Sequence, residues 1–360
     1  PEFKVAKQQA VTDILRQYHP VPDRFDELGT EGSGPKSHWR PLLQQLNLES
    51  VAGLNLRAQA VSNAIAEDGV TYNVYEDPRG DTRPWEVDLL PLVLGADEWQ
   101  WLSKAVAQRA ELLDSVLADL YGEQSLLKEG LMPPALVYGQ AGFQWPCQGI
   151  QPAGGRFLHL YAVDLARAPD GGWWVMADRT QAPSGAGYAL QNRLVISRAF
   201  PAPFHNLPVT NLSEFFQGFQ NSLAGMSPAG TESPLCVLLT PGRFNETYFE
   251  HVFLARYLGL PLVEGQDLTV RDDTVYLKTL QGLRRVHAIY RRLDDGFCDP
   301  LELRADSVLG IPGLLGAVRA GKVLMANALG SGVLESAALF GFLPEISKKL
   351  LGSPLAMPSV

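Results

Sequence analysis

A strand–helix–strand pattern between residues 235 and 263 constrains the fold more than any other feature of the sequence. Residues 235–239 are continuously apolar, as expected of a strand buried on both faces, and residues 260–263 form a second short apolar run. The segment between them, residues 247–258, has the length of a helix and is followed by Gly259. This order predicts the repeating unit of a doubly wound sheet, whose ligand crevice lies at the carboxyl ends of the strands.

The rest of the chain divides into regions of different character. Residues 1–145 are dominated by helical patterns and predict a mainly helical N-terminal region, whereas residues 146–232 predict a β-rich unit. Residues 233–345 contain the strand–helix–strand unit, and residues 346–360 close the chain. The loop at residues 225–234 is the expected domain boundary. The expected fold class is therefore α/β, with several α+β elements.

Local patterns give the expected bounds of the other elements. Helices are predicted at residues 4–20, at 39–66, from Asp97 to about 120, and from Ser213. Strands are predicted at residues 70–75, 157–165, 173–177, 194–197, 268–270, 275–277 and 286–290.

Composition argues against two classes of binding partner, nucleic acids and membranes. The 360 residues include 30 Lys and Arg against 39 Asp and Glu, a formal charge of −9 that argues against a nucleic-acid-binding protein. The sequence has no apolar run long enough to cross a bilayer and no secretory signal pattern, so no membrane partner is expected. Its three cysteines, Cys147, Cys236 and Cys298, are far apart and odd in number. They indicate reduced thiols in a cytoplasmic protein.

A stretch from residue 173 to residue 198 carries groups suited to a metal ion and a phosphate. Asp178 ends a predicted strand, a glycine-bearing loop follows, and the polar residues Gln191 and Asn192 precede the next predicted strand. Carboxylate and amide oxygens are the ligands that Mg²⁺ prefers, and backbone amides of glycine loops bind anions. A plain hairpin with a solvated loop explains the same residues equally well, so both interpretations stay open.

Two further strand ends carry polar clusters. Arg291 and Arg292 follow the strand at 286–290 and precede Asp295, so a guanidinium there could hold a phosphate or a carboxylate. The loop that begins at Asn327 is rich in glycine and could present backbone amides to an anion. A salt-bridged strand terminus and a helix cap, respectively, are the alternatives. Motifs for P-loop nucleotide binding, HExxH metalloproteases and GxSxG hydrolases are not present in the sequence.

Four long motifs, taken together and in order, resemble one known family. They read ADRTQAPSGAGYALQNR, VLLTPGRFNETYFEHVFLARYLGLPLVEGQDLTV, RVHAIYRRLDDGFCDPLELRADSVLGIPGL and AGKVLMANALGSGVLES. The resemblance, which covers roughly residues 39–360, is to the circularly permuted type 2 ATP-grasp family, similar to the synthetase half of glutathionylspermidine synthase. It implies an ATP-grasp fold with permuted chain order. It also implies an ATP- and Mg²⁺-dependent carboxylate–amine ligase that forms an amide through an acyl phosphate.

The resemblance also implies roles for individual residues. Metal ligation is implied for Asp178, Gln191 and Asn192. Contacts to the nucleotide or the acyl phosphate are implied for Arg179, Ser184, Gly185 and Arg193, contacts to the substrate for Asn245, Glu246 and Asn327, and catalytic roles for Arg291, Arg292 and Asp295.

Two departures from the family pattern matter. The family pattern usually has glutamate where this chain has Gln191, and the loss of one negative charge is expected to weaken Mg²⁺ binding. The family's nucleotide lysine and glycine-rich lid are expected beyond Val360, so residues 346–360 are interpreted as the start of a lid segment that a C-terminal domain or a partner completes. The expected substrates are a small-molecule or peptide carboxylate and an amine.

Two other functions remain open from the sequence. Gln191 motivates a non-catalytic ATP-grasp scaffold that binds a peptide, a metabolite or a partner protein. A weaker alternative is a phosphotransferase whose reaction stops at the acyl phosphate.

Overall fold

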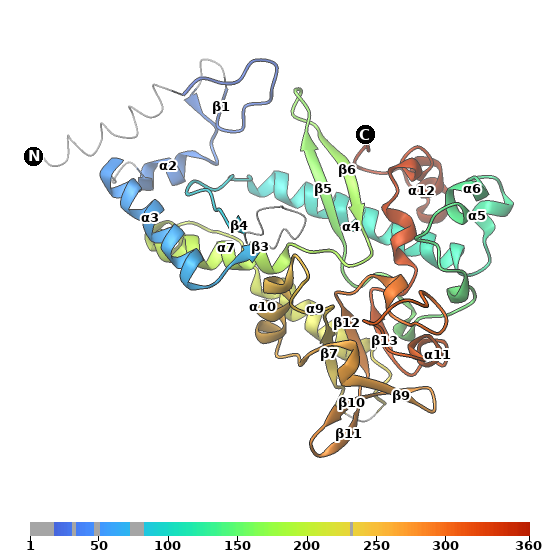
Figure 1. Ribbon diagram of the computed structural model, residues 1–360. Coiled ribbons are helices and arrows are strands. Elements are labelled where there is room, and N and C mark those ends of the chain that lie inside the picture. The colour runs from blue at the N-terminus through green and yellow to red at the C-terminus, as the bar shows by residue number, and fades with distance from the viewer. Residues whose placement is uncertain (1–17, 31–33, 47–50, 73–82, 231–232) are drawn as a thin grey trace, which may run out of the picture. The chain divides into compact units, whose positions relative to one another are not determined.

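The computed structural model describes residues 18–30, 34–46, 51–72, 83–230 and 233–360 (Figure 1). They form two compact units, each assembled from segments that are not consecutive in the chain. The first unit comprises the described residues up to Leu102 together with Arg167–Trp173 and Ala186–Leu212. The second unit comprises Ser103–Ala166, Trp174–Gly185 and Ser213–Val360.

A four-stranded parallel sheet lies at the centre of the second unit. Its strands are β7 (Cys236–Leu239), β8 (Leu262–Val263), β12 (Ala288–Arg291) and β13 (Leu324–Ala326), in the order β13-β12-β7-β8. Helix α10 (Tyr248–Leu258) connects β7 to β8, as the strand–helix–strand pattern predicts. Gly259 ends this helix in the left-handed region with φ 66°, where glycine is favoured.

The order of the strands reverses between β7 and β12. From β7 the chain continues to β8, which pairs with one edge of β7, whereas the later strand β12 pairs with the opposite edge of β7. In open parallel sheets, ligands bind outside the carboxyl ends of the two strands at which the order reverses. We call the carboxyl ends of β7 and β12 the switch point. Thr240 and Arg292 are the first residues beyond these two strands.

The second unit contains further elements besides this sheet. Its antiparallel sheet has the order β11-β10-β9 and consists of β9 (Leu268–Arg271), β10 (Thr274–Thr279) and β11 (Gly282–Arg285). Its helices include α5 (Ser125–Lys128), α6 (Pro134–Tyr138), α9 (Ser213–Met226), α11 (Leu314–Arg319) and α12 (Leu343–Leu351). Short 3-10 turns lie at Trp145–Cys147, Ala153–Gly155, Gly265–Asp267, Asp295–Phe297, Ser331–Glu335 and Ala337–Leu339.

Three elements have residues in both units. Helix α4 (Ala96–Leu120) begins in the first unit and continues in the second, where Leu112, Leu113 and Leu117 are completely buried. Strands β5 (Ala162–Arg167) and β6 (Trp173–Arg179) pair in a two-stranded ribbon.

The first unit is mainly helical. Its helices are α2 (Arg40–Leu46), α3 (Val51–Glu67), α7 (Ala186–Ala199) and α8 (Pro201–Asn206). Its short strands pair as β1 (Gly29–Thr30) with β2 (Gly34–Pro35) and as β3 (Thr71–Tyr72) with β4 (Arg83–Pro84). The helix expected at residues 4–20 lies almost wholly outside the described residues, as does the second half of the strand expected at 70–75.

The strand predicted at residues 194–197 is wrong, because these residues belong to helix α7. Tyr188, Gln191 and Val195 are all buried and recur at helical spacing. Since the polar Gln191 occupies one of these buried positions, the apolar stripe is interrupted in the sequence. Only the short run at 194–197 then stands out, and periodicity cannot assign so short a run.

The segment 146–232 is consequently more helical than expected. It contains the β5–β6 ribbon followed by α7, α8 and α9. The described residues of the segment 225–234, which was expected to separate two domains, belong to the second unit.

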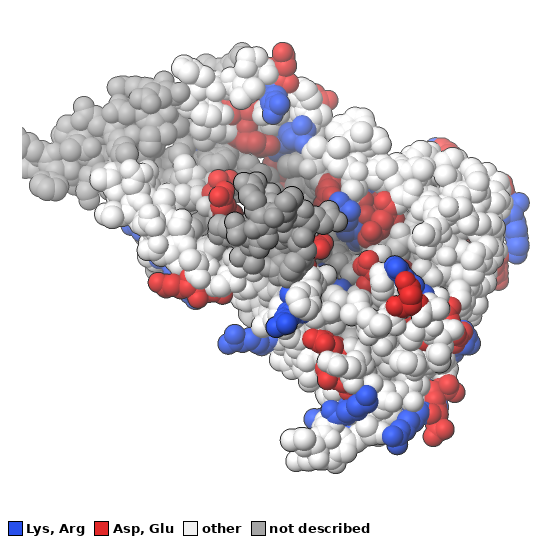
Figure 2. Space-filling view, in the orientation of Figure 1, with Lys and Arg blue, Asp and Glu red and all other residues white. Residues whose placement is uncertain are grey.

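Other properties of the described residues bear on partners. None of the helices in the described ranges is long and apolar enough to cross a membrane. Cys147, Cys236 and Cys298 are buried free thiols, as expected from their number and spacing. Figure 2 shows described acidic and basic side chains interspersed over one face of the molecule rather than gathered into a basic surface.

The buried sheet provides a test of the fold. Ile289 lies in the middle of β12, between two parallel neighbours, and is 0% exposed. We expect Ile289→Ala to lower the free energy of unfolding by about 2–5 kcal/mol, because it leaves a cavity in a close-packed core. Denaturant unfolding followed by circular dichroism measures the change. Leu280→Ala, at a fully exposed turn position, is the matched control and should leave stability unchanged.

Candidate functional site

Residues 180–185, which follow β6, form a loop tied to the carboxyl edge of the parallel sheet. Its first half is held by Glu335 and Asn327. One carboxylate oxygen of Glu335 accepts hydrogen bonds from the backbone N–H groups of Thr180 and Gln181, both at 2.8 Å. The side-chain amide of Asn327, the first residue after β13, donates to the carbonyl oxygen of Thr180 at 2.7 Å.

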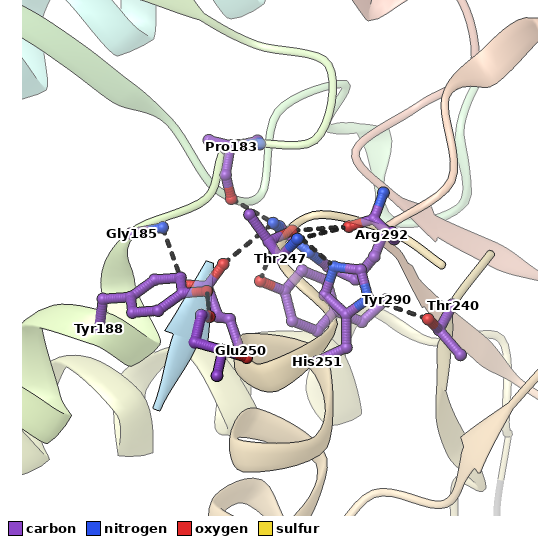
Figure 3. Close-up of polar contacts among 11 residues, drawn as sticks. Pro183, Gly185, Tyr188, Thr240, Thr247, Glu250, His251, Tyr290 and Arg292 are labelled. Carbon is purple, nitrogen blue, oxygen red and sulfur yellow. Dashed lines mark hydrogen bonds and ion pairs between the residues drawn. The ribbon is translucent and has the colours of Figure 1, made fainter. Parts of the chain in front are cut away.

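The second half of the loop is held at the switch point (Figure 3). Arg292 Nη1 donates to the carbonyl oxygen of Pro183 at 2.5 Å, and Gly185 N–H donates to Glu250 Oε1 at 2.7 Å. Arg292 Nη2 and Glu250 Oε2 are 3.2 Å apart, and both side chains are buried. Gly185 has φ +113°, a conformation that favours glycine at this place in the loop.

His251 extends the buried polar cluster at the switch point. Its Nδ1 lies 2.9 Å from Thr240 Oγ1, and its Nε2 lies 3.1 Å from Thr247 Oγ1. Burial, reinforced by the positive charge of Arg292, lowers the pKa of His251 to about 2. The imidazole is therefore neutral at physiological pH, and the two threonine hydroxyls pair with its ring nitrogens. We call Thr240, Thr247, Glu250, His251, Tyr290 and Arg292 the switch-point cluster.

The two neighbouring arginines differ in how their donors are used. In Arg291, Nε donates to the carbonyl oxygen of Asn327 at 2.8 Å and Nη1 to that of Leu293 at 2.9 Å. Its Nη2 donates to the carbonyl oxygen of Ala328 at 3.1 Å, so every nitrogen of this fully buried guanidinium is paired. Nε of Arg292, by contrast, is buried with no hydrogen-bond partner among the described residues. The donors of Arg291 are thus used to hold backbone carbonyl groups, whereas Arg292 still has one donor, Nε, that could bind a ligand.

Asp295 and Asn327 also hold the loops at this edge. Asp295 Oδ1 accepts from Gly296 N–H at 2.7 Å and Oδ2 from Gly330 N–H at 3.1 Å. Burial raises the pKa of Asp295, and the charge of Arg291 opposes that shift. The oxygen of the Asn327 side chain accepts from the N–H groups of His159 and Leu160 at 2.7 and 2.9 Å.

Asp178, expected to bind a metal, forms a buried ion pair in the second unit. Its Oδ1 and Oδ2 lie 2.7 and 2.8 Å from Nε and Nη2 of Arg109. The hydroxyl of Tyr161 donates to Oδ1 at 2.5 Å, and burial raises the pKa of that hydroxyl. Both carboxylate oxygens are therefore engaged by protein donors.

Gln191, Asn192 and Arg193 lie on helix α7 of the first unit and contact neighbours there. Gln191 Nε2 donates to a carboxylate oxygen of Asp68 at 2.6 Å. Trp85 Nε1 donates to the side-chain oxygen of Asn192 at 2.7 Å. Arg193 Nη1 donates to the carbonyl oxygen of residue 210 at 2.8 Å, and burial lowers the pKa of the Arg193 guanidinium.

The other predicted residues lie at the surface or near the start of α10. Arg179 is exposed and pairs with Asp164 at 2.7 Å, and Ser184 is exposed in the loop. The side-chain oxygen of Asn245 accepts from Thr247 N–H at 2.9 Å just before α10 begins, whereas Glu246 is exposed.

Sequence reasoning missed Glu250 and His251. On α10, residues 250, 251, 254, 255 and 258 are buried at helical spacing, so the side chains of Glu250 and His251 lie on the buried face of the helix. A charged residue on the same helical face as Leu254 and Leu258 is the signal that could have identified this pair, because burying a charge is costly without a partner. That partner, Arg292, is distant in the sequence.

Comparison with known proteins identifies the family of this chain. The model of the family described as "Circularly permuted ATP-grasp type 2" matches residues 91–360. The chain belongs to this family. The sequence resemblance to circularly permuted type 2 ATP-grasp proteins is therefore confirmed, as is a mixed α/β architecture consistent with an ATP-grasp-like fold.

Relatives of this ATP-grasp chain include longer proteins that are named as uncharacterized. An uncharacterized protein of Mycobacterium tuberculosis is 40% identical over 340 residues, which cover 92% of this chain and 38% of that protein. An uncharacterized protein of Synechocystis is 38% identical over 332 residues, which cover 92% of this chain and 69% of that protein. The chain thus spans well under half the length of the mycobacterial relative.

A solved structure supports the fold alone. The apo form of a glutathione synthetase-like effector from Globodera pallida superposes with a TM-score of 0.52 at 13% sequence identity. The similarity covers 84% of this chain and 69% of that chain.

Proteins of the ATP-grasp family typically bind ATP and Mg²⁺. The described residues are better suited to an anion than to the metal ion. Arg292, whose buried Nε has no hydrogen-bond partner within the described ranges, is suited to an anionic group at the switch point. For Mg²⁺, no group of three or more His, Cys, Asp or Glu side chains in the described segments is arranged to hold a metal. Both oxygens of Asp178 already accept hydrogen bonds from Arg109, so a Mg²⁺ ion bound there would compete with this ion pair.

The Arg109–Asp178 pair provides a second test. We expect Asp178→Asn to lower the free energy of unfolding by about 3–5 kcal/mol, because it leaves the buried Arg109 without its counter-ion. The exposed pair of Arg179 and Asp164 is the matched control, and Asp164→Asn should cost about 0–1 kcal/mol. Denaturant unfolding of both variants makes the comparison. Equal small losses in the two variants would show that the buried pair is not structural.

Proposed function

We propose that the protein is an ATP- and Mg²⁺-dependent carboxylate–amine ligase that forms an amide or peptide bond. Such an enzyme uses ATP to activate a carboxylate as an acyl phosphate, from which an amine displaces phosphate. The observation that carries the proposal is family membership over residues 91–360, since ATP-grasp proteins typically perform this reaction. The substrates would be a small-molecule or peptide carboxylate and an amine.

The geometry of the switch point supports an anionic ligand. Arg292 lies just beyond the carboxyl end of β12, where open parallel sheets bind ligands, and its buried Nε has no hydrogen-bond partner in the part of the chain that the structure describes. The loop of residues 180–185 covers the neighbouring positions through Pro183 and Gly185. Among the residues expected from the sequence, we therefore retain Arg292 and Gly185 as those closest to a ligand. Arg291, Asp295 and Asn327 would act by holding the loops around them.

A second candidate is a non-catalytic ATP-grasp scaffold. The observation that favours it is the state of the expected metal ligands. Asp178 is paired with Arg109, and Gln191, a neutral residue, is bonded to Asp68 within the first unit. A scaffold of this kind would bind a peptide, a metabolite or a partner protein without turnover.

The ligase proposal predicts nucleotide binding and turnover. We expect calorimetry to detect ATP binding in the presence of Mg²⁺, and ADP and phosphate to be released when a carboxylate and an amine are supplied together. The measurements should be made on this chain and on a form extended to the length of the relatives, because the chain spans 38% of one of them. Absence of ATP binding from both forms would refute the ligase.

Gln191→Glu discriminates the two candidates. Gln191 Nε2 donates to Asp68, so a glutamate in its place would put two carboxylates side by side. We expect the melting temperature of this variant to fall in EDTA, because like charges repel, and to recover with Mg²⁺ if the position can ligate metal. Gln59→Glu, on helix α3 of the same unit, is the matched control, since Gln59 is exposed and bonded to Asn63. A loss that Mg²⁺ does not restore would favour the scaffold.

A further inference from the structure

Glu250 performs two tasks at the switch point with its two carboxylate oxygens. Oε1 accepts the N–H of Gly185 and so holds the end of the 180–185 loop. Oε2 pairs with Arg292 Nη2 at a distance of 3.2 Å. The Glu250 side chain is completely buried on α10. A single carboxylate therefore closes the loop and neutralises the guanidinium beneath it.

Arg292 is not saturated by this arrangement. Its Nη1 reaches the carbonyl oxygen of Pro183, and the Tyr290 hydroxyl lies 3.3 Å from the same nitrogen. Its Nε has no partner among the described residues, although the side chain is 2% exposed. A planar guanidinium binds a carboxylate best through two parallel donors, such as Nε and one Nη. Glu250 uses one donor and leaves the bidentate position unfilled.

We propose that Glu250 is an internal ligand of Arg292, and that a carboxylate ligand binds at the switch point by replacing it. The incoming carboxylate would take Nε and Nη2 of Arg292 together. Glu250 would release Gly185, the 180–185 loop would open, and water would reach Glu250. The exchange keeps a carboxylate on the buried guanidinium and gains one charge-assisted hydrogen bond. The ligand class rests on the proposed function, in which the substrate is a carboxylate.

The arrangement in Figure 3 suits such an exchange. Pro183 and Gly185 lie on the loop side of the cluster, and both are held there only through Arg292 and Glu250 in the hydrogen bonds drawn. Thr240 and Thr247 pair with the ring nitrogens of His251. The exchange would break the Arg292–Glu250 contact and leave these two hydrogen bonds of the histidine in place.

The experiment is a titration of the ¹⁵N-labelled chain with glutarate, in the absence of nucleotide. Glutaramide serves as the uncharged probe of the same shape, and inorganic phosphate as the other anion. The arginine Nε–H signals report binding, and hydrogen exchange at Gly185 N–H reports loop opening. We expect glutarate to shift the Arg292 Nε–H signal and to accelerate exchange at Gly185, and glutaramide to do neither.

Glu250→Gln weakens the internal ligand while keeping its shape. Glutamine offers one oxygen to the two donors that glutamate serves, so one of the two contacts is lost. We expect its affinity for glutarate to rise about tenfold over wild type. The double variant Arg292→Met/Glu250→Gln avoids a lone buried charge and should not bind glutarate. Arg304→Ala, at a surface pair with Asp306, is the control and should bind like wild type.

Unchanged glutarate affinity in a folded Glu250→Gln variant would overturn the proposal. Tighter binding of phosphate than of glutarate would overturn the assignment to a carboxylate. If Glu250→Gln does not fold, hydrogen exchange at Gly185 in the wild type decides alone, and exchange unaffected by glutarate refutes the exchange of ligands. Because nucleotide is left out, failure here is separate from failure of the ligase to bind ATP.

Discussion

The carboxyl edge of the parallel sheet depends on buried polar side chains whose partners are backbone groups. Loops that leave parallel strands carry N–H and C=O groups into the interior, and each must be paired. Arg291 supplies donors to carbonyl groups after β13, while Asn327 supplies both donors and acceptors to the chain before β5 and after β6. Asp295 accepts from the loop that contains Gly330. These side chains hold in place the loops next to the switch-point cluster.

Arg291 and Arg292 are neighbours in the sequence but contact different parts of the fold, and the geometry of the strand explains why. Successive side chains along an extended strand point to opposite faces of the sheet. Arg291 is directed to the loop after β13, whereas Arg292 is directed to α10 and to the 180–185 loop. One guanidinium is consequently saturated by hydrogen-bond acceptors, chiefly carbonyl oxygens, and the other contacts the carboxylate of Glu250. The pair Arg-Arg looks uniform in the sequence and is not uniform in the fold.

The sequence was sufficient to predict helices and strands where a single hydrophobic periodicity dominated a segment. The continuous apolar run at β7 identifies a buried strand, the mostly apolar run at 286–290 identifies β12, and the helical spacing between β7 and β8 identifies α10. It was insufficient where a buried position is polar. Gln191 interrupts the buried stripe of α7, so residues 194–197 resemble a strand. Glu250 was missed for the same reason, because only the three-dimensional neighbour Arg292 explains a charge on the buried face of α10.

The expected metal ligands show how pairing and metal binding compete for the same oxygens. Arg109 and Tyr161 use three of the roughly four lone pairs of the Asp178 carboxylate. A Mg²⁺ ion bound tightly at this carboxylate would draw it away from Arg109, at a cost comparable to breaking a buried ion pair. The Arg109–Asp178 pair and a tightly held cation at Asp178 therefore compete, and the structure is the one in which the pair has formed.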